Sequence, residues 1–114
     1  MKYVILIYSN PDSWNSLTPE QQEAVGQGHA DLAAELTASG KYLAGTGLDD
    51  HKLTTTVRVR RGEVTTTDGP FAEAKEHLAG FYLIDCADHD EAVAIAARMP
   101  DAAIDFVLVR PALH

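Results

Sequence analysis

The sequence is poor in cysteine and in the residue spacings that bind metals. Cys86 is the one cysteine among 114 residues, which excludes a disulfide within the chain. It ends a strand-like apolar run, and we interpret it as a small buried residue rather than a nucleophile. The five histidines contain no HExxH motif and no paired spacing, and the run Asp49-Asp50-His51 does not supply one. We therefore expect no metal site and no cofactor.

Positive charge is also scarce. Nine lysines and arginines stand against 17 aspartates and glutamates, which gives a net charge of −8. Binding to nucleic acid or to anionic lipid needs a basic surface, so neither partner is expected. Arg58, Arg60 and Arg61 form a small basic patch, which we interpret as a charged, exposed hairpin that resists edge pairing.

Long hydrophobic runs are missing as well. No stretch reaches the roughly 18 uncharged apolar residues that a membrane span needs, so no membrane association is expected. The apolar run from Tyr3 to Tyr8 is too short for a signal peptide, and no small-residue cleavage site follows it. These features lead us to expect a cytoplasmic protein. The length and the hydrophobic content of 46% suit one globular domain over residues 1–114.

Two apolar runs predict the central strands of a sheet. Residues 2–8 (KYVILIY) and 80–86 (GFYLIDC) are apolar on both faces, as expected for strands that are covered on both sides. Shorter strands are expected at residues 41–48 and 103–110. The turn-rich residues 9–17 are expected to form a loop, with its tryptophan over the core.

A hairpin and a motif separate the second strand from the third. Residues 54–67 (TTTVRVRRGEVTTT) predict a hairpin with Arg61-Gly62 at its turn, so that Val59 faces Val64 and Arg60 faces Glu63. Asp68-Gly69-Pro70 then predicts a sharp corner. A short helical turn is expected over residues 71–78.

Two helices are marked by their ends. Thr18 with Gln21 forms a capping-box pattern, and Gly40 predicts the end of the helix that begins there. Its apolar stripe consists of Val25, His29, Leu32 and Leu36. Asp88 predicts the start of a second helix, residues 89–99, which is expected to end at Pro100.

Without the hairpin, the expected order is strand, helix, strand, strand, helix, strand. This order predicts an α+β, ferredoxin-like antiparallel sheet with two helices on one face, plus an inserted β-hairpin. Two helices cover only one face of a sheet whose central strands are apolar on both. The uncovered face would expose apolar surface to water, so we expect a homodimer in which these faces meet.

Two stretches resemble a known family. Residues 65–85 (TTTDGPFAEAKEHLAGFYLID) and 28–48 (GHADLAAELTASGKYLAGTGL) are similar to the DGPF-motif subgroup of the YCII-related family. The resemblance implies a dimeric α+β barrel of ferredoxin-like subunits. It also implies an active centre with a histidine of the first helix and a nearby aspartate, which here would be His29 and Asp68. Members of this subgroup often occur beside extracytoplasmic-function sigma factors, so the resemblance implies by association a role in regulation or stress response.

The residues allow more than one role for each candidate. His29 is either a satisfied core histidine or an acid-base group oriented by a carboxylate. Asp68 is either a turn residue or that carboxylate. Gly45 and Gly47 would let a ligand approach the backbone. Phe71 would anchor the motif in the core, while Glu73 and Lys75 form either a solvated face or the mouth of a ligand pocket.

Three functions follow from these alternatives. The first is a small enzyme that uses His29 and Asp68 for acid-base chemistry on a small polar molecule. The second is a non-enzymatic dimeric module that binds a ligand or a regulator in the same pocket. The third, a purely structural dimer, gives no reason for a histidine within the apolar stripe.

Overall fold

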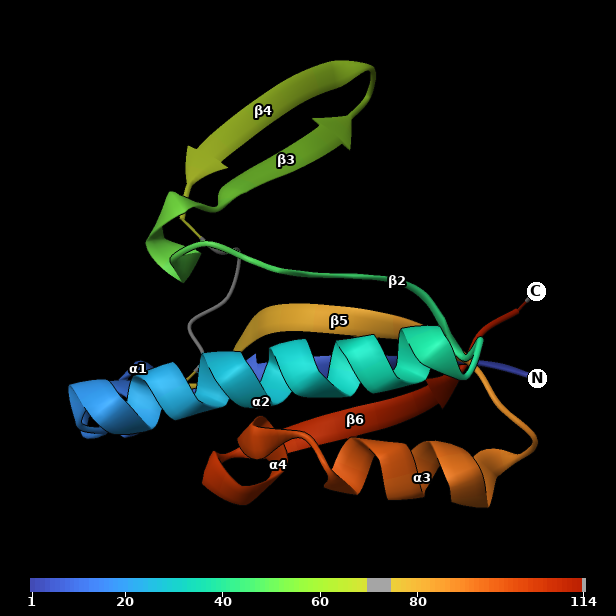
Figure 1. The fold of residues 1–114 in the computed structure, drawn as a ribbon. Helices are drawn as coiled ribbons and strands as arrows, with labels where there is room; N and C mark the ends of the chain where they lie inside the picture. The colour runs from blue at the N-terminus through green and yellow to red at the C-terminus, as the bar shows by residue number, and fades with distance from the viewer. Residues whose placement is uncertain (70–74, 114) are drawn as a thin grey trace.

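The chain is a mixed α+β protein with an antiparallel sheet (Figure 1). The computed structural model describes residues 1–69 and 75–113. Four α-helices and a 3-10 helix, η1, occur in these residues. In chain order the elements are β1 (Lys2–Ser9), α1 (Pro11–Asn15), α2 (Pro19–Ala38), β2 (Tyr42–Gly47), η1 (His51–Leu53), β3 (Thr55–Arg60), β4 (Glu63–Asp68), β5 (His77–Asp85), α3 (His89–Ala97), α4 (Pro100–Ile104) and β6 (Phe106–Pro111).

Four strands form the main sheet in the order β2-β5-β1-β6, and every neighbouring pair is antiparallel. The two runs that are apolar on both faces, β1 and β5, therefore lie in the centre, as the sequence predicted. Strands β3 and β4 pair only with each other among the described residues. No closed barrel is formed within the described part of this chain.

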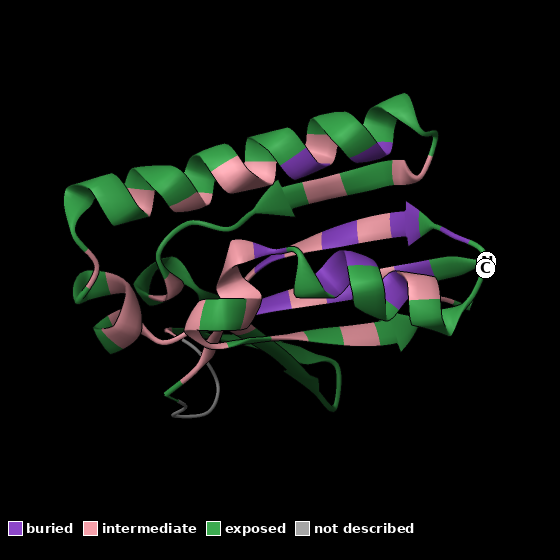
Figure 2. Ribbon diagram, turned by 60° about the horizontal axis from the view of Figure 1, so that its bottom comes forward, coloured by how far each residue is buried: buried purple, intermediate pink, exposed green. Residues whose placement is uncertain are grey.

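The core lies between the sheet and the helices. Tyr3, Ile5 and Ile7 of β1 are buried, and Leu32 and Leu36 of α2 meet them from the helix side. Figure 2 shows the buried residues gathered on the central strands and on the helix faces turned toward them. The apolar stripe predicted for α2 is thus the face that packs on the sheet.

The opposite face of the sheet is less well covered. Val4, Leu6 and Tyr8 alternate with the buried residues of β1 and are half-buried. On β6, Phe106 and Leu108 remain exposed in this chain. Leu6 lies opposite Leu108, and Tyr8 opposite Phe106 with the two rings stacked. The face therefore presents a continuous apolar surface.

The start of α2 follows the predicted capping box. The Thr18 hydroxyl accepts a hydrogen bond from the Gln21 amide, and the Gln21 side chain accepts one from the Thr18 amide. At the other end Gly40 has a φ of 73°, as expected for a glycine that ends a helix. The limits of this helix can thus be read from local chemistry.

Three local predictions were wrong. Residues 11–15, expected in a loop, form α1 because Asn10 caps the Asp12 amide and Pro11 suits a first helical turn. Pro100 starts α4 instead of only ending the previous helix, so the last strand begins at Phe106. His77 belongs to β5 rather than to a helical turn, because β1 extends far enough to pair with it.

The hairpin has the predicted register. Val59 lies opposite Val64 and Arg60 opposite Glu63, and Arg61 and Gly62 at the turn have positive φ. In Figure 1 the hairpin stands away from the helices and from the four-stranded sheet. Nearly all its residues are exposed.

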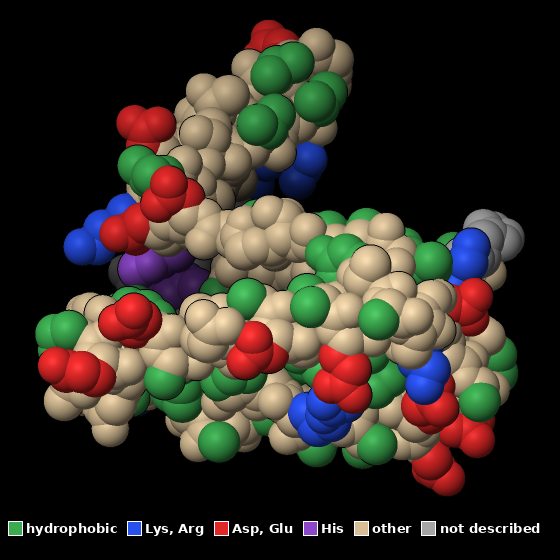
Figure 3. Space-filling view, viewed as in Figure 1, with side chains coloured by type: hydrophobic (Ala, Val, Ile, Leu, Met, Phe, Trp, Pro, Cys, Tyr) green, Lys and Arg blue, Asp and Glu red, His purple; other side chains and the backbone are tan. Residues whose placement is uncertain are grey.

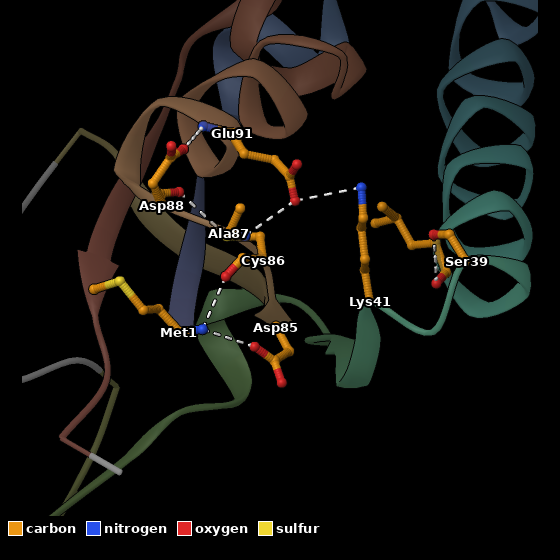
Figure 4. Close-up of polar contacts among 9 residues, drawn as sticks. Met1, Ser39, Lys41, Asp85, Cys86, Ala87, Asp88 and Glu91 are labelled. Atoms are coloured by element: carbon orange, nitrogen blue, oxygen red, sulfur yellow. Dashed lines mark hydrogen bonds and ion pairs between the residues drawn. The ribbon is translucent and has the colours of Figure 1, made fainter.

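A polar network joins the chain start to the first turn of α3 (Figure 4). The amino group of Met1 donates to Asp85 and to the Cys86 carbonyl oxygen at 2.9 and 2.8 Å. Lys41, which follows α2, forms an ion pair with Glu91 at 3.3 Å.

Burial raises the pKa of the Cys86 thiol, in keeping with a structural residue. Across the described residues, no helix has the length and apolar character needed to span a membrane.

Candidate functional site

A cavity of about 710 Å³ lies between α2, β2, β5 and η1. This volume is in the range of small-molecule sites. Its wall combines apolar side chains such as Trp14 and Leu48 with polar groups from separate parts of the chain. His29, Tyr82 and Asp101 gather on one part of the wall, while His51 and His77 lie on another.

Both ring nitrogens of His29 are engaged. Its Nε2 forms a hydrogen bond with Oδ1 of Asp101, and its Nδ1 lies 2.9 Å from the Tyr82 hydroxyl. An ionised carboxylate can only accept, so Nε2 carries the proton. In the neutral ring Nδ1 then accepts the hydrogen bond of the Tyr82 hydroxyl. The side chains of His29 and Asp101 are 24% and 15% exposed, so the pair is shielded but accessible from the cavity.

Close packing of two helices brings this pair together. A Cβ added at Gly28 would lie 2.7 Å from Cγ of Pro100, so only glycine allows this approach. His29 and Asp101 directly follow these two residues in the chain. The glycine on α2 and the proline at the start of α4 therefore place the imidazole beside the carboxylate.

Tyr82 reaches the histidine from the sheet. It is buried on β5, and its ring packs edge-on against Tyr42 of β2. Burial raises the pKa of the Tyr82 phenol, and the neighbouring Tyr42 and Asp101 raise it further. The hydroxyl therefore keeps its proton at neutral pH. It also lies 3.4 Å from the His29 carbonyl oxygen, which gives it a second acceptor.

A second pair of imidazoles lines the cavity near the base of the hairpin. The rings of His51 and His77 stack with their centroids 3.8 Å apart and an angle of 12° between their planes. Asp50 lies 3.4 Å from Nδ1 of His51 and caps η1 through the Lys52 amide. Figure 3 shows histidine side chains in the hollow between the hairpin and the body of the molecule.

These imidazoles do not form a metal cluster. Within residues 1–69 and 75–113, no group of three or more histidine, cysteine, aspartate or glutamate side chains is placed to bind a metal ion. The donor groups present instead suit hydrogen bonding and proton transfer.

The structure separates the two predicted catalytic residues. His29 lines the cavity, but the carboxylate that meets it is Asp101. Asp68 is exposed at the end of β4, opposite Thr55, and is not among the described residues that line the cavity. Asp68 is the last residue of the hairpin, which stands away from α2 (Figure 1). A catalytic role for Asp68 stays a prediction.

The predicted ligand-binding residues have different positions. Gly45 and Gly47 line the cavity. At Gly45 a Cβ would lie 2.8 Å from the Phe81 carbonyl oxygen, so this glycine is also required by the pairing of β2 with β5. Lys75 is exposed and is not among the described residues that line the cavity. Phe71 and Glu73 lie outside the described residues.

Sequence reasoning missed Asp101 and Tyr82. The local signal for Asp101 was the Pro100-Asp101 pair, because proline followed by an acidic residue is typical of a helix start. Tyr82 gave no separate signal, since an aromatic residue in an apolar strand normally indicates core packing. Neither residue could be linked to His29 without the tertiary contacts.

Comparisons with known proteins agree with the family resemblance. The YCII-related domain family matches residues 1–113. An uncharacterised protein of Rhizobium meliloti (strain 1021) is 35% identical over 102 residues, which cover 90% of this chain and 82% of that protein. The chain belongs to the YCII-related domain family.

Proposed function

We propose that this protein is a small enzyme that transfers a proton to or from a small polar molecule in the cavity. One observation carries the proposal: Asp101, His29 and Tyr82 form a hydrogen-bonded chain that lines a cavity of about 710 Å³. Asp101 orients the imidazole and stabilises its charged form. The imidazole supplies a group whose ordinary pKa suits proton transfer near neutral pH.

Tyr82 can serve both protonation states of the histidine. With a neutral ring, the Tyr82 hydroxyl donates to Nδ1 at 2.9 Å. With a charged ring, Nδ1–H donates to the hydroxyl oxygen, and the phenol proton turns to the His29 carbonyl oxygen at 3.4 Å. A change of charge on His29 therefore requires only rotation of one hydroxyl. A ligand would exchange its proton with His29 through the Tyr82 oxygen. Alternatively, the ligand would displace the Tyr82 hydroxyl from Nδ1 and exchange the proton with His29 directly.

The cavity wall indicates what such a ligand would be. Apolar side chains surround it, and polar groups occur near His29 and again near the stacked His51 and His77. Lys52 adds a positive charge near the second group. This arrangement supports a small molecule with an apolar middle and polar groups at both ends.

Proton transfer can be tested without knowing the reaction. The protein is incubated in D₂O with 2-oxo acids and 1,3-dicarbonyl compounds, and incorporation of deuterium at carbon is followed by NMR. His29→Asn should lower the rate by about 100-fold or more, because acid-base groups typically contribute that much. Asp31→Asn is the matched control, since Asp31 lies on the same helix, is exposed, and accepts a hydrogen bond from the Gln27 side chain.

A binding module is the second candidate. The observation that favours it is that both ring nitrogens of His29 already have partners, which leaves the histidine as a positioning group. In that case His29→Asn changes the affinity for a bound carbon acid, and no deuterium is incorporated by any variant. If His29→Leu raises stability and alters neither binding nor exchange, both candidates fail and the histidine belongs to the core.

We further infer a ferredoxin-like subunit that forms a homodimer. The strand order β2-β5-β1-β6 and the two longer helices support the first inference. The half-buried Leu6 and the exposed Leu108 on the uncovered face support the second. Assignment to the DGPF subgroup, a place in the cytoplasm and a link to an extracytoplasmic-function sigma factor are proposals from the resemblance and composition.

A further inference from the structure

A β-bulge in β5 brings His77 to the cavity. The pairing of β5 with β1 passes over Ala79, so that His77 lies opposite Ser9, and both of these paired residues line the cavity. Side chains alternate between the two faces of a regular strand, so His77, five residues before Tyr82, would otherwise lie on the opposite face. The extra residue returns His77 to the face of Tyr82, because a bulge re-aims the side chains beyond it.

The same bulge holds the loop that carries the second imidazole. The Ala79 carbonyl oxygen accepts a hydrogen bond from the Leu48 amide at 2.8 Å. Leu48 directly follows β2 and lies shortly before His51, the first residue of η1. The rings of His51 and His77 then stack with their centroids 3.8 Å apart. Main-chain hydrogen bonds of the sheet therefore position both imidazoles.

The stacked pair and Lys52 have nitrogen atoms that are free to bind a ligand. Among the described residues, neither ring nitrogen of His77 has a hydrogen-bond partner, and the Lys52 ammonium forms no ion pair. Asp50 lies 3.4 Å from Nδ1 of His51, which leaves Nε2 without a partner in the described part of the chain. All three residues line the cavity. Such a group of nitrogen donors suits an oxygen anion.

Two carboxylates also line this end of the cavity, and the loop itself engages both. Asp49 accepts a hydrogen bond from the Asp50 amide at 2.7 Å, and Asp50 accepts one from the Lys52 amide at 2.9 Å. Two charged imidazoles stacked this closely repel each other, and a bound anion offsets that repulsion. With one lysine and two acids nearby, the cluster suits a singly charged carboxylate better than a doubly charged phosphate.

The two ends of the cavity indicate the length of the ligand. Tyr82, which meets His29, lies five residues from His77 on β5, and this corresponds to about 15 Å of extended strand. Ala79 and Gly80 line the cavity between the two positions, and their small size leaves room for the middle of a ligand. A molecule that reaches both ends is therefore elongated.

We propose that His51, His77 and Lys52 form an anion subsite that binds the carboxylate of an elongated carboxylic acid. The carbon that exchanges its proton lies at the other end of the cavity, beside His29. This inference rests on the proposed function, because it names the class of substrate on which the proton transfer acts. The subsite residues bind and orient the substrate and take no part in the proton transfer.

A matched pair of probes tests the preference for an anion. The acid is 7-oxooctanoate, a methyl ketone with a carboxylate at its other end, and its methyl ester has nearly the same shape without the charge. Trp14 is the one tryptophan of the chain and lines the cavity, so its fluorescence reports binding. The wild-type protein should bind the acid about tenfold or more tightly than the ester, because the ester loses the charge-assisted hydrogen bonds. Equal binding, a preference for the ester or no binding of either probe would overturn the proposal.

Two variants locate the subsite. His77→Phe keeps a flat ring on His51 and removes both ring nitrogens, while Lys52→Met removes the charge of an exposed residue. Each should reduce the preference for the acid by about threefold or more, and the double variant should abolish it. Lys2→Met is the matched control, because Lys2 is exposed and is not among the described residues that line the cavity. Circular dichroism checks that each variant keeps the fold.

The same variants can contradict the assignment. A preference for the acid that survives in the double variant would overturn it. Equal losses in Lys52→Met and Lys2→Met would also overturn it, since the effect would then come from the net charge of the protein.

Deuterium incorporation into 7-oxooctanoate separates this inference from the proposed function. His29→Asn should bind the acid with the wild-type preference and exchange deuterium about 100-fold or more slowly. If the wild-type protein exchanges deuterium but shows no preference for the acid, the subsite alone is overturned. If it prefers the acid but catalyses no exchange, the subsite is supported and the proposed proton transfer fails.

Discussion

The four-stranded sheet and the two-stranded hairpin differ in what holds them together. Strand β1 alternates fully buried residues such as Ile5 with half-buried ones such as Leu6, and helices cover one of its faces. Strand β3 also alternates valine with arginine, yet both faces of the hairpin that it forms with β4 are exposed. Burial of apolar side chains stabilises the four-stranded sheet, whereas cross-strand pairing and a tight turn define the hairpin. A sequence pattern can thus specify a local shape without specifying what covers it.

The largest expected effect tests this contrast directly. Ile84 is completely buried in the centre of the sheet, whereas Val64 on the hairpin is 66% exposed. Ile84→Ala should lower the free energy of unfolding by about 3 kcal/mol, because it leaves a cavity in the core. Val64→Ala should change it by about 0.5 kcal/mol or less. Urea denaturation, at a protein concentration that keeps the oligomeric state constant, measures the free energy of unfolding of both variants. Similar losses of stability in the two variants would refute the contrast.

A smaller effect is expected where α2 meets α4. Gly28→Ala should destabilise the protein by about 1–3 kcal/mol, because the added methyl group overlaps Pro100 and forces the helices apart. Gly26→Ala is the control, since nothing lies within 4 Å of an added Cβ there. It should stabilise the same helix by up to about 1 kcal/mol. If Gly28→Ala leaves the free energy of unfolding unchanged, α2 and α4 can separate without loss of stability.

The same variant also tests how the site is assembled. Displacement of α4 from α2 would lengthen the contact between His29 and Asp101, which depends on that close approach. The imidazole NMR chemical shifts of His29 should then change in Gly28→Ala and stay as in the wild type in Gly26→Ala. Unchanged chemical shifts in both variants would mean that the pair does not depend on this helix contact.

The smallest effect concerns Tyr82 at alkaline pH. Its pKa is raised in the folded protein by burial, by Tyr42 and by Asp101, while an unfolded tyrosine titrates near pH 10. Below pH 10 Tyr82 is protonated in both the folded and the unfolded state, so its contribution to the free energy of unfolding is fully present. As pH rises further, the unfolded state loses its proton first, so stability falls until the folded pKa is reached. Tyr82→Phe should show a shallower alkaline decline in unfolding experiments, and equal declines would contradict the assignment.

Much of the fold was accessible from the sequence. The capping residues of α2, the turn at Arg61-Gly62 and the central position of β1 and β5 were predicted correctly, because each depends on neighbouring residues or on an apolar pattern. The ends of β5 and β6 were not, since the pairing of distant strands decides where a strand stops.

The candidate site was also predictable only in part. His29 was recognised because an ionisable ring within an apolar helical stripe requires a partner wherever it is buried. The identity of that partner depends on the approach of α4 to α2 and on the face that β5 turns toward them. The family resemblance led instead to Asp68, which ends β4 and is not among the described residues that line the cavity.

The sequence by itself determined the limits of α2, the hairpin register and the need of His29 for a polar partner. These follow from interactions between residues close in the chain and from the cost of burying a polar group. Only the tertiary structure decided that Asp101 and Tyr82 meet His29, because they lie 72 and 53 residues away from it in the chain. Long-range packing brings such groups together, and no local pattern encodes which of many acids or phenols will arrive.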